Sequence, residues 1–350
     1  MKVAQIVAPN EPLQLKDLEI PKPKEAEVVV KVKAVGVCHS DLHLWEGGYD
    51  AGSGSFMKAT DRGVKFPVTP GHEVVGTVTQ TGGSVTGIKT GDEVLVYPWI
   101  GCGTCPACKV GNENLCDVPR SLGVFQNGGY AEYVLVPHFK YLIKVSGIDL
   151  EGAASLACSG LTAFTAVKKA NTTAEQFVVI IGAGGLGLMG IQIAKAITKS
   201  TIICADLDDN KLAAAKKMGA DHTINSKDPD AAQKIISICN NKGAECIIDF
   251  VNAPPTVKMD LTVLRKRGNL ILVGLFGGSA ELVLPTIPLK AITIQGAYTG
   301  NYNNLVELVD LAKRGVISPI ISKRYSLSEA NAALEELKRG KIIGRAVINP

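Results

Sequence analysis

The stretch Phe177-Val-Val-Ile-Ile-Gly-Ala-Gly-Gly-Leu-Gly187 decides the fold of the second half of the chain. Its five leading apolar residues predict a strand, and the apolar run Leu188 to Ala196 directly after the glycines predicts a helix. Gly182, Gly184 and Gly187 follow the G-x-G-x-x-G spacing, which allows a tight turn, close approach of a pyrophosphate and close packing of helix on strand. The stretch therefore predicts a dinucleotide-binding strand, turn and helix.

The next predicted strand ends in a carboxylate that bears on the choice of cofactor. Thr201-Ile-Ile-Cys-Ala205 is followed by Asp206, 19 residues beyond Gly187. A carboxylate there can accept hydrogen bonds from the 2′-hydroxyl of the adenosine ribose and would repel a 2′-phosphate. NAD(H) is therefore favoured, although nearby Lys211 softens the discrimination and leaves NADP(H) possible.

Strands and helices continue to alternate beyond Asp206. Further strands are predicted over 222–225, 246–250, 269–274 and 292–297, with helices over 231–239 and 256–265. Together with the two strands already described, that makes six, the count of a doubly wound dinucleotide-binding sheet. The last fifty residues, with helices over 305–314 and 328–339 and a strand over 344–348, are expected to return to the first domain.

The first half of the chain is predicted to form a barrel-type β domain. The β-branched run from Val28 to Val35 predicts a strand, and Gly36 after it is expected to let the backbone turn sharply. Alternating Val and Thr continue the β pattern from Glu73 to Trp99. The Gly- and Ser-rich segment from Trp45 to Phe56 predicts a loop, either a mobile lid or a surface linker.

Four thiols stand close together in the sequence, with the spacing C-x2-C-x2-C-x7-C. They are Cys102, Cys105, Cys108 and Cys116. Four thiolates at this spacing can surround one tetrahedral zinc ion, and a site with four sulfur ligands has no open position for a substrate. The spacing predicts a structural zinc site, while a redox or disulfide role is the alternative.

A second set of metal-binding residue types is spread over three segments. Val37-Cys-His-Ser-Asp-Leu-His43 holds a thiol, two imidazoles, a hydroxyl and a carboxylate, Gly71-His-Glu73 adds an imidazole and a carboxylate, and Ala157-Cys-Ser-Gly160 adds a thiol. Two Cys and one His are the protein ligands of a catalytic zinc whose fourth position stays open. The alternative is that Cys38 and Cys158 are ordinary buried core residues, since distant ligands carry no spacing signature.

Length and composition limit the classes of protein that fit. A chain of 350 residues, 46% apolar and 20% charged, predicts a globular protein of two domains. A net charge of +4 without a basic run argues against nucleic-acid binding. The N-terminus does not resemble a signal peptide and no apolar run is long enough to span a bilayer, so we expect a cytoplasmic protein without membrane contact.

The order of these motifs resembles the zinc-dependent medium-chain alcohol dehydrogenases, most closely the archaeal and bacterial branch, over nearly the whole chain. The resemblance implies a GroES-like β-barrel catalytic domain over 1–159 and 300–350, with the structural zinc lobe at 98–118. It implies a doubly wound Rossmann dinucleotide-binding domain over 160–299.

The resemblance also implies roles for individual residues. Cys38, His72 and Cys158 would hold the catalytic zinc, with Glu73 as an occasional or alternative ligand, and Asp41 would orient His72. Ser40 and His43 would form the proton relay. The cofactor contacts would be His39 and Arg345 at the pyrophosphate, Thr162, Leu186 and Val273 at the nicotinamide, Asp206 and Lys211 at the ribose, and Gly182, Gly184 and Gly187 in the turn.

The predicted function is a zinc-dependent alcohol dehydrogenase or aldehyde reductase with two zinc ions per subunit. It would transfer a hydride reversibly between NAD(H) and a small primary or secondary alcohol and its aldehyde or ketone. One alternative is an NADPH-dependent reductase of a small, carboxylate-bearing semialdehyde, and a second is a dinucleotide-binding protein without catalysis on the same fold. By resemblance, subunits pair through the strand at 292–297 as a homotetramer or a homodimer.

Overall fold

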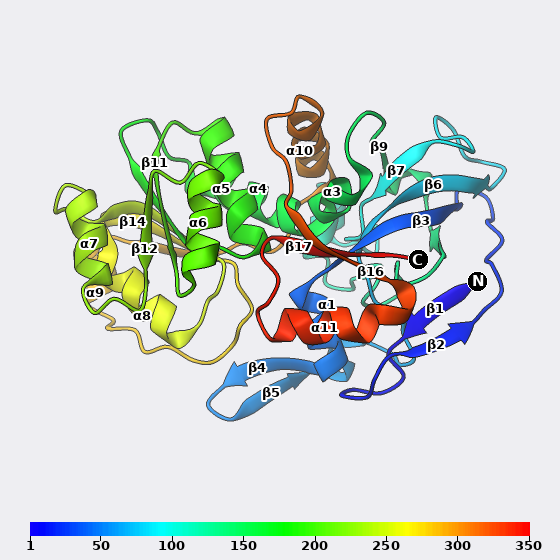
Figure 1. The fold of residues 1–350 in the computed structure, drawn as a ribbon, viewed down its shortest axis with the longest axis horizontal. Helices are drawn as coiled ribbons and strands as arrows, with labels where there is room; N and C mark the ends of the chain where they lie inside the picture. Colours follow the sequence, from blue (N-terminus) through cyan, green and yellow to red (C-terminus); the bar gives the residue numbers. More distant parts are fainter.

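A six-stranded parallel sheet occupies one end of the molecule in the computed structural model, which describes residues 1–350 (Figure 1). Its strands are β10 (Phe177–Ile181), β11 (Thr201–Asp206), β12 (His222–Asn225), β13 (Ala244–Asp249), β14 (Leu264–Leu272) and β15 (Thr293–Gly296). They lie in the order β12-β11-β10-β13-β14-β15, and every neighbouring pair is parallel. All six strands expected from the sequence are present, in the order of a doubly wound dinucleotide-binding sheet.

Helices that connect successive strands along the chain cover this sheet (Figure 1). They are α5 (Gly185–Ile197), α6 (Asp209–Lys217), α7 (Ala231–Ile238), α8 (Pro254–Val263) and the short α9 (Thr286–Lys290). Helix α5 begins three residues earlier than predicted, because Gly185, Leu186 and Gly187 form its first turn. The strand order reverses between β10 and β13, so the carboxyl ends of the strands open a crevice there, where such sheets bind ligands.

A second sheet, largely antiparallel, occupies the other end of the molecule (Figure 1). Its order is β16 (Ile321–Ser326), β17 (Arg345–Asn349), β3 (Val28–Val37), β6 (Glu73–Thr81), β7 (Glu93–Val96) and β9 (Leu142–Lys144), and β8 (Tyr133–Val136) also pairs with β3. The short pair β1 (Lys2–Gln5) and β2 (Gln14–Asp17) forms a sheet of its own, and β1 is bonded to the segment before β8 through a bridge between Val3 and Ala131. Because β17 pairs antiparallel with β3, the end of the chain returns to the first half, as expected.

Gly36 does not turn the backbone, so this part of the prediction was wrong. Strand β3 continues through Gly36 to Val37. A β-carbon at Gly36 would lie 1.9 Å from Oε2 of Glu73, on the neighbouring strand β6. Glycine is needed here because it lets a buried carboxylate lie directly against the strand.

The segment expected to be a loop is largely ordered secondary structure. Helix α1 (His39–Glu46) is followed by a hairpin of β4 (Gly48–Gly52) and β5 (Ser55–Lys58), and then by a single 3-10 turn (Thr60–Arg62). The tip of the hairpin touches the loop after β14, since the amide of Gly278 donates to the carbonyl of Asp50. The hairpin therefore connects the two ends of the molecule below their junction (Figure 1).

A continuous helical run joins the two sheets. It consists of α3 (Leu150–Ser155), a π-helical turn (Leu156–Gly160) and α4 (Leu161–Ala170), and it contacts β3 and β6 on one side and β13 and β14 on the other. The run is long and apolar enough to cross a membrane, contrary to our expectation, but 83% of its most apolar window is buried inside the molecule. It is therefore a core element of the fold.

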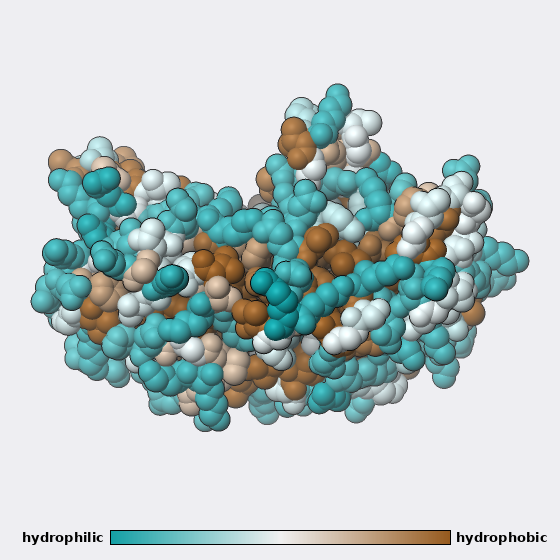
Figure 2. Space-filling model, turned by 90° about the horizontal axis from the view of Figure 1, so that it is seen from above, coloured by the Kyte–Doolittle hydropathy of each residue, from teal (hydrophilic) through white to brown (hydrophobic).

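The remaining helices lie outside the sheets. They are α2 (Pro106–Lys109), α10 (Tyr302–Lys313) and α11 (Ala330–Lys338). Figure 2 shows that hydrophilic residues cover most of one face of the molecule, with apolar residues gathered mainly near its middle.

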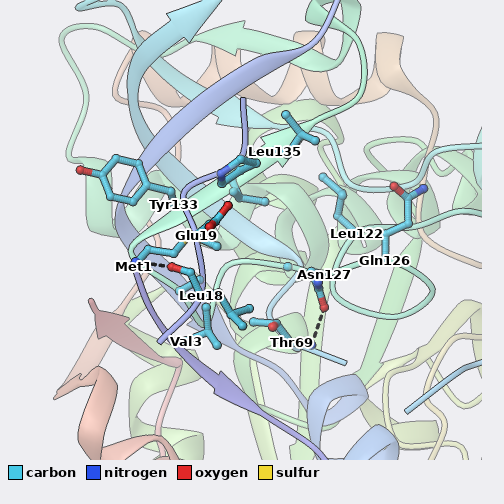
Figure 3. Close-up of a pocket in the computed structure, with 14 residues that line it drawn as sticks. Met1, Val3, Leu18, Glu19, Thr69, Leu122, Gln126, Asn127, Tyr133 and Leu135 are labelled. Atoms are coloured by element: carbon cyan, nitrogen blue, oxygen red, sulfur yellow. Dashed lines mark hydrogen bonds between the residues drawn. The ribbon is translucent and has the colours of Figure 1, made fainter. Parts of the chain in front are cut away.

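A cavity of about 450 Å³ lies between the N-terminal strands and β8, away from the crevice of the parallel sheet (Figure 3). Thr69 and Asn127 line it and are joined by a hydrogen bond from the amide of Thr69 to the side chain of Asn127. The N-terminal ammonium of Met1 donates to the carbonyl of Leu18 at its edge. Eight of its fourteen lining residues are hydrophobic, and we assign this cavity no chemistry.

One buried carboxyl group in α8 is unpaired. Asp260 is fully buried, and neither oxygen of its side chain has a hydrogen-bond partner. Burial raises the pKa of Asp260 well above its usual value, and the negative charge of Asp249 raises it further. Asp249 is itself held by hydrogen bonds from the amides of Val251 and Asn252. Asp260 is therefore the group that keeps its proton in the folded protein.

We predict that Asp260→Asn makes the protein relatively more stable as the pH rises. The unfolded chain ionises Asp260 at a pKa of about 3.9 while the folded chain keeps the proton, so the wild type loses stability above that pH, by at most about 1.4 kcal/mol per pH unit. Asparagine cannot ionise. The midpoint of thermal unfolding of the variant relative to wild type should therefore rise between about pH 5 and about pH 8.

The control is Asp17→Asn on β2, which removes an exposed carboxylate. Its unfolding midpoint relative to wild type should not change over the same range. A constant difference between Asp260→Asn and wild type would show that Asp260 ionises alike in the folded and unfolded chain.

Candidate active site

Four metal-binding side chains meet at the junction of the two sheets. They are Cys38, His72, Glu73 and Cys158; all four are buried, and their ligand atoms lie within 4.8 Å of one another. Cys38 precedes the first turn of α1, and His72 and Glu73 stand at the start of β6. Cys158 lies in the π-helical turn, where the wider backbone ring displaces its side chain from a regular helical position.

The geometry of this cluster fits a zinc ion. The sulfur atoms of Cys38 and Cys158 are 3.9 Å apart, close to the ~3.8 Å between two sulfurs bound tetrahedrally at about 2.3 Å. Nε2 of His72 is buried without a hydrogen-bond partner. A buried unpaired imidazole nitrogen is costly, and a metal ion would satisfy it. The three ligands predicted from separate segments of the sequence therefore lie together.

Asp41 holds two of the ligand-bearing segments in place. It is fully buried on the first turn of α1. Its Oδ2 accepts the amide of Cys38 at 2.9 Å, and its Oδ1 accepts the amide of Gly71 at 3.1 Å and lies 3.2 Å from Nδ1 of His72. The hydroxyl of Tyr130 lies 3.5 Å from Oδ2. One carboxylate therefore orients both Cys38 and His72, as ligand-supporting carboxylates do.

Glu73 is bound to an arginine from the far end of the chain. The buried guanidinium of Arg345 donates to both oxygens of Glu73, with Nε at 3.1 Å from Oε2, and the amide of Ser159 donates to Oε1 at 3.2 Å. Such a bidentate pair is a strong, oriented contact. Glu73 lies in the metal cluster as expected, yet its carboxylate is already engaged by Arg345.

The glycine-rich turn has the shape that a pyrophosphate requires. Gly182 has a φ of 89°, which favours glycine, and a β-carbon at Gly187 would lie 1.7 Å from the carbonyl oxygen of Gly182. A β-carbon at Gly184 would meet no atom within 4 Å, so the space beside it is open. The turn leads directly into the N-terminus of α5, where amides and the helix dipole attract anions.

Positive charge gathers beside this turn. A β-carbon at Gly185 would lie 3.2 Å from Nη1 of Arg345, so the guanidinium borders the start of α5. Desolvation lowers the pKa of His39, the charge of Cys38 opposes this shift, and the cations Arg345 and Lys211 lower the pKa further. Of the three basic side chains predicted to contact the cofactor, Arg345 is thus placed at the N-terminus of α5.

Asp206 lies at the carboxyl end of β11. Its Oδ2 accepts the amide of Ala183 at 2.6 Å, and its Oδ1 accepts the amide of Asp208 at 3.0 Å. These bonds fix the carboxylate against the glycine-rich turn, where the adenosine ribose of a bound dinucleotide lies in this fold. Each oxygen keeps a second lone pair for a ribose hydroxyl.

The other predicted site residues border the same crevice. Thr162 is buried in α4 just after the π-helical turn, Leu186 lies in the first turn of α5, and Val273 follows the carboxyl end of β14. Ser40 and His43 are three residues apart on α1 and so share one face of the helix. Burial lowers the pKa of His43, which keeps its ring neutral near pH 7.

A group of aromatic side chains lies beside the cluster, and two of them, Tyr49 and Tyr298, were missed in the sequence. Measured between ring centres, Tyr49 lies 4.6 Å from His43. Trp99 lies 5.3 Å from His72 and 6.1 Å from Tyr298. They come from the β4 hairpin, the segment after β7 and the segment after β15. No motif links these segments, and only the fold brings them together.

The four cysteines of the predicted structural site also lie together. Their sulfur atoms lie within 4.8 Å of one another, with Cys102 4.0 Å from Cys108 and Cys105 3.8 Å from Cys116. Hydrogen bonds from Thr104 lower the pKa of Cys102 to about 5, whereas desolvation raises the pKa of Cys108 to about 12. A divalent cation would hold all four as thiolates.

Comparison with known proteins agrees with this geometry. Residues 24–147 match the family model of the alcohol dehydrogenase GroES-like domain, and residues 185–314 match that of the zinc-binding dehydrogenase. NAD-dependent alcohol dehydrogenases from Sulfurisphaera tokodaii and Saccharolobus solfataricus are 43% and 41% identical to the chain, with 100% of each chain covered. The crystal structure of the alcohol dehydrogenase from Aeropyrum pernix matches at a TM-score of 0.91 and 33% identity over 100% of both chains.

We predict that the purified protein binds two zinc ions per chain and that Cys105→Ser binds one. Loss of the four-sulfur site removes a cross-link between the ends of the 98–118 lobe, so the unfolding midpoint should fall by roughly 3 °C, as a loss of ~2 kcal/mol would give in a chain of this length. Elemental analysis and thermal unfolding measure both effects. Cys239→Ser, which changes a buried thiol outside both clusters, is the control for zinc content. Two zinc ions in Cys105→Ser would contradict the assignment.

Proposed function

The chain belongs to the zinc-dependent medium-chain alcohol dehydrogenases and is an oxidoreductase, and on that premise we propose which reaction it performs and with which residues. The reaction is reversible hydride transfer between NAD(H) and a small primary or secondary alcohol and its aldehyde or ketone. The observation that carries this proposal is the buried cluster of Cys38, His72 and Cys158 beside the glycine-rich turn. Metal ligands and a dinucleotide site at one crevice suit hydride transfer to or from a polarised oxygen-bearing carbon.

Cys38, His72 and Cys158 are the zinc ligands in this proposal. Zinc supplies a Lewis acid for the substrate oxygen, and the nicotinamide supplies or accepts the hydride. Asp41 keeps His72 in the orientation in which Nε2 can bind the metal, because it lies against Nδ1. Ser40 and then His43 carry the substrate proton toward solvent along one face of α1.

Arg345 and Glu73 have linked roles. The guanidinium borders the pyrophosphate side of α5 while it binds the carboxylate beside the metal ligands. In our proposal Arg345 contacts the pyrophosphate, and Glu73 serves first as its partner and second as an alternative metal ligand. His39, Lys211, Thr162, Leu186 and Val273 complete the cofactor contacts.

NAD(H) is the preferred cofactor in this proposal, with NADP(H) as the weaker alternative. The carboxylate of Asp206 is fixed where the ribose would lie and would repel a 2′-phosphate. The relatives reported above are themselves named NAD-dependent. The catalytic domain is proposed to span 1–159 and 300–350 and the cofactor domain 160–299, and the enzyme is proposed to work in the cytoplasm.

The subunits are proposed to associate through the free edge of β15, as a homotetramer or a homodimer. Strand β15 ends the parallel sheet, so one of its edges has no partner within the chain. Large apolar side chains lie exposed just before it, with Val283, Leu284 and Leu289 exposed by 65%, 71% and 73%. An unpaired edge beside exposed apolar residues is a typical interaction surface.

We predict that zinc-replete protein oxidises NADH with a small aldehyde or ketone, and oxidises NADPH more slowly. In Asp206→Ser the ratio of the NADH rate to the NADPH rate should fall by at least about tenfold, because the carboxylate that repels the 2′-phosphate is lost. Cys38→Ser should lose turnover while it still binds NADH, measured by fluorescence titration. Cys246→Ser, a buried thiol distant in sequence from every ligand, is the control and should keep turnover.

Three results would contradict these proposals. Oxidation of NADPH alone would overturn the role of Asp206. Full activity in Cys38→Ser would remove that ligand from the reaction. Bound NADH and zinc without any turnover would favour a dinucleotide-binding protein without catalysis.

For the assembly, we predict an equilibrium sedimentation mass of two or four times 36.8 kDa. Leu284→Asp should reduce the mass to that of the monomer, because a charge would be buried in the apolar interface. Leu15→Asp, an exposed apolar residue on β2, should leave the mass unchanged. A wild-type mass near 36.8 kDa would overturn the proposal.

A further inference from the structure

Arg62 lies beside the candidate active site without an acidic partner. It ends the 3-10 turn that follows the β4 hairpin, and its guanidinium carbon lies 5.5 Å from the ring centre of Tyr49. Arg62 forms no ion pair with a carboxylate of the chain. Its sequence neighbour Asp61 forms no ion pair either. Arg345, the other arginine of the site, is paired with Glu73.

The guanidinium of Arg62 lies near two tyrosine hydroxyls. Burial raises the pKa of Tyr49 to about 12, and the adjacent charge of Arg62 acts in the opposite direction. Burial also raises the pKa of Tyr298, and Arg62 again opposes it. The cation therefore lies within reach of both phenols, although these come from opposite halves of the sequence.

These side chains connect Arg62 to the metal ligands by two routes. On one side the ring of Tyr49 lies tilted against that of His43, with the ring centres 4.6 Å apart, on the helix that begins after Cys38. On the other, Tyr298 contacts Trp99 at 6.1 Å, and Trp99 contacts His72 at 5.3 Å. Tyr49, Tyr298 and Trp99 thus form a row of aromatic rings, the aromatic wall, with Arg62 at one end and the metal-binding cluster at the other.

A guanidinium in this position favours an anionic group. The face of the Tyr49 ring attracts the cation, while neither phenol neutralises its charge. Its planar set of donors matches a carboxylate in two parallel hydrogen bonds. A carboxylate brought there by a substrate would find an exposed guanidinium that no protein acid occupies.

We propose that Arg62 is a specificity-determining residue that binds the carboxylate of an anionic substrate, a short aldehyde or alcohol bearing a carboxylate at the end opposite to its reactive carbon. This inference rests on the proposed function, because it takes the reactive carbon to lie at the cluster of Cys38, His72 and Cys158. Tyr49, Trp99 and Tyr298 line the path between the two ends of such a substrate. The preferred substrate class is then a semialdehyde and its hydroxy acid.

The test compares butanal with its terminal carboxylate, 4-oxobutanoate, which share the same carbon chain. Wild-type zinc-loaded enzyme should show a higher kcat/KM for 4-oxobutanoate. Arg62→Gln should lower kcat/KM about 10- to 100-fold more for 4-oxobutanoate than for butanal, mainly through KM, which is the range for a hydrogen-bonded charge pair. Arg62→Lys keeps the charge and loses the planar donor set. Its preference for 4-oxobutanoate over butanal should therefore lie between those of the wild type and Arg62→Gln.

Lys65→Gln is the matched control, since it removes an exposed positive charge three residues away that contacts neither tyrosine. Its ratio of the two kcat/KM values should equal that of the wild type. Raising the salt concentration should increase the wild-type KM for 4-oxobutanoate and not for butanal, because screening weakens an exposed charge contact.

The failures of the two proposals can be told apart. Turnover of butanal with no preference for 4-oxobutanoate, or an equal loss with both aldehydes in Arg62→Gln, overturns the role of Arg62 and leaves the proposed function intact. Turnover of neither aldehyde, nor of any ketone, by zinc-loaded protein that binds NADH overturns the proposed function and this inference with it.

Discussion

The carboxylate of Asp41 is the constraint on which the site depends. It is fully buried, and it accepts hydrogen bonds from the amides of Cys38 and Gly71 while it lies against the ring of His72. The start of α1 and the start of β6 are therefore fixed to each other through one side chain. Buried charges are retained only when they are paired or hydrogen-bonded, so this carboxylate ties the position of two metal ligands to the stability of the β domain.

A second buried pair, Glu73 and Arg345, links that site to the cofactor side of the crevice. Arg345 comes from β17, which returns to pair with β3, and its guanidinium borders the first turn of α5. Gly36 is required because no larger residue leaves space for the carboxylate of Glu73. One ion pair therefore lies between the glycine-rich turn and the metal-binding cluster.

Much of this could be predicted from the sequence, and the exceptions have physical reasons. Local patterns identified the six parallel strands, the glycine-rich turn and the four-cysteine cluster, because each depends on residue type and short spacing. The ligands Cys38, His72 and Cys158 are far apart in the sequence, and only the family resemblance joined them. The π-helical turn at Cys158 and the aromatic wall of Tyr49, Trp99 and Tyr298 arise from tertiary packing and leave no local pattern. The hairpin after α1 was mistaken for a loop because its Gly and Ser residues supply two tight turns and little β propensity.

The most direct test of the central claim is a zinc titration of chelated enzyme, with bound zinc and NADH oxidation measured in the same samples. We predict that activity follows the filling of only one of the two zinc sites in each chain. Cys105→Ser, which lacks the four-sulfur site, should regain activity when it binds its single zinc ion. Activity that persists after all zinc is removed, or that does not follow zinc in Cys105→Ser, would contradict the assignment of Cys38, His72 and Cys158 as the catalytic metal site.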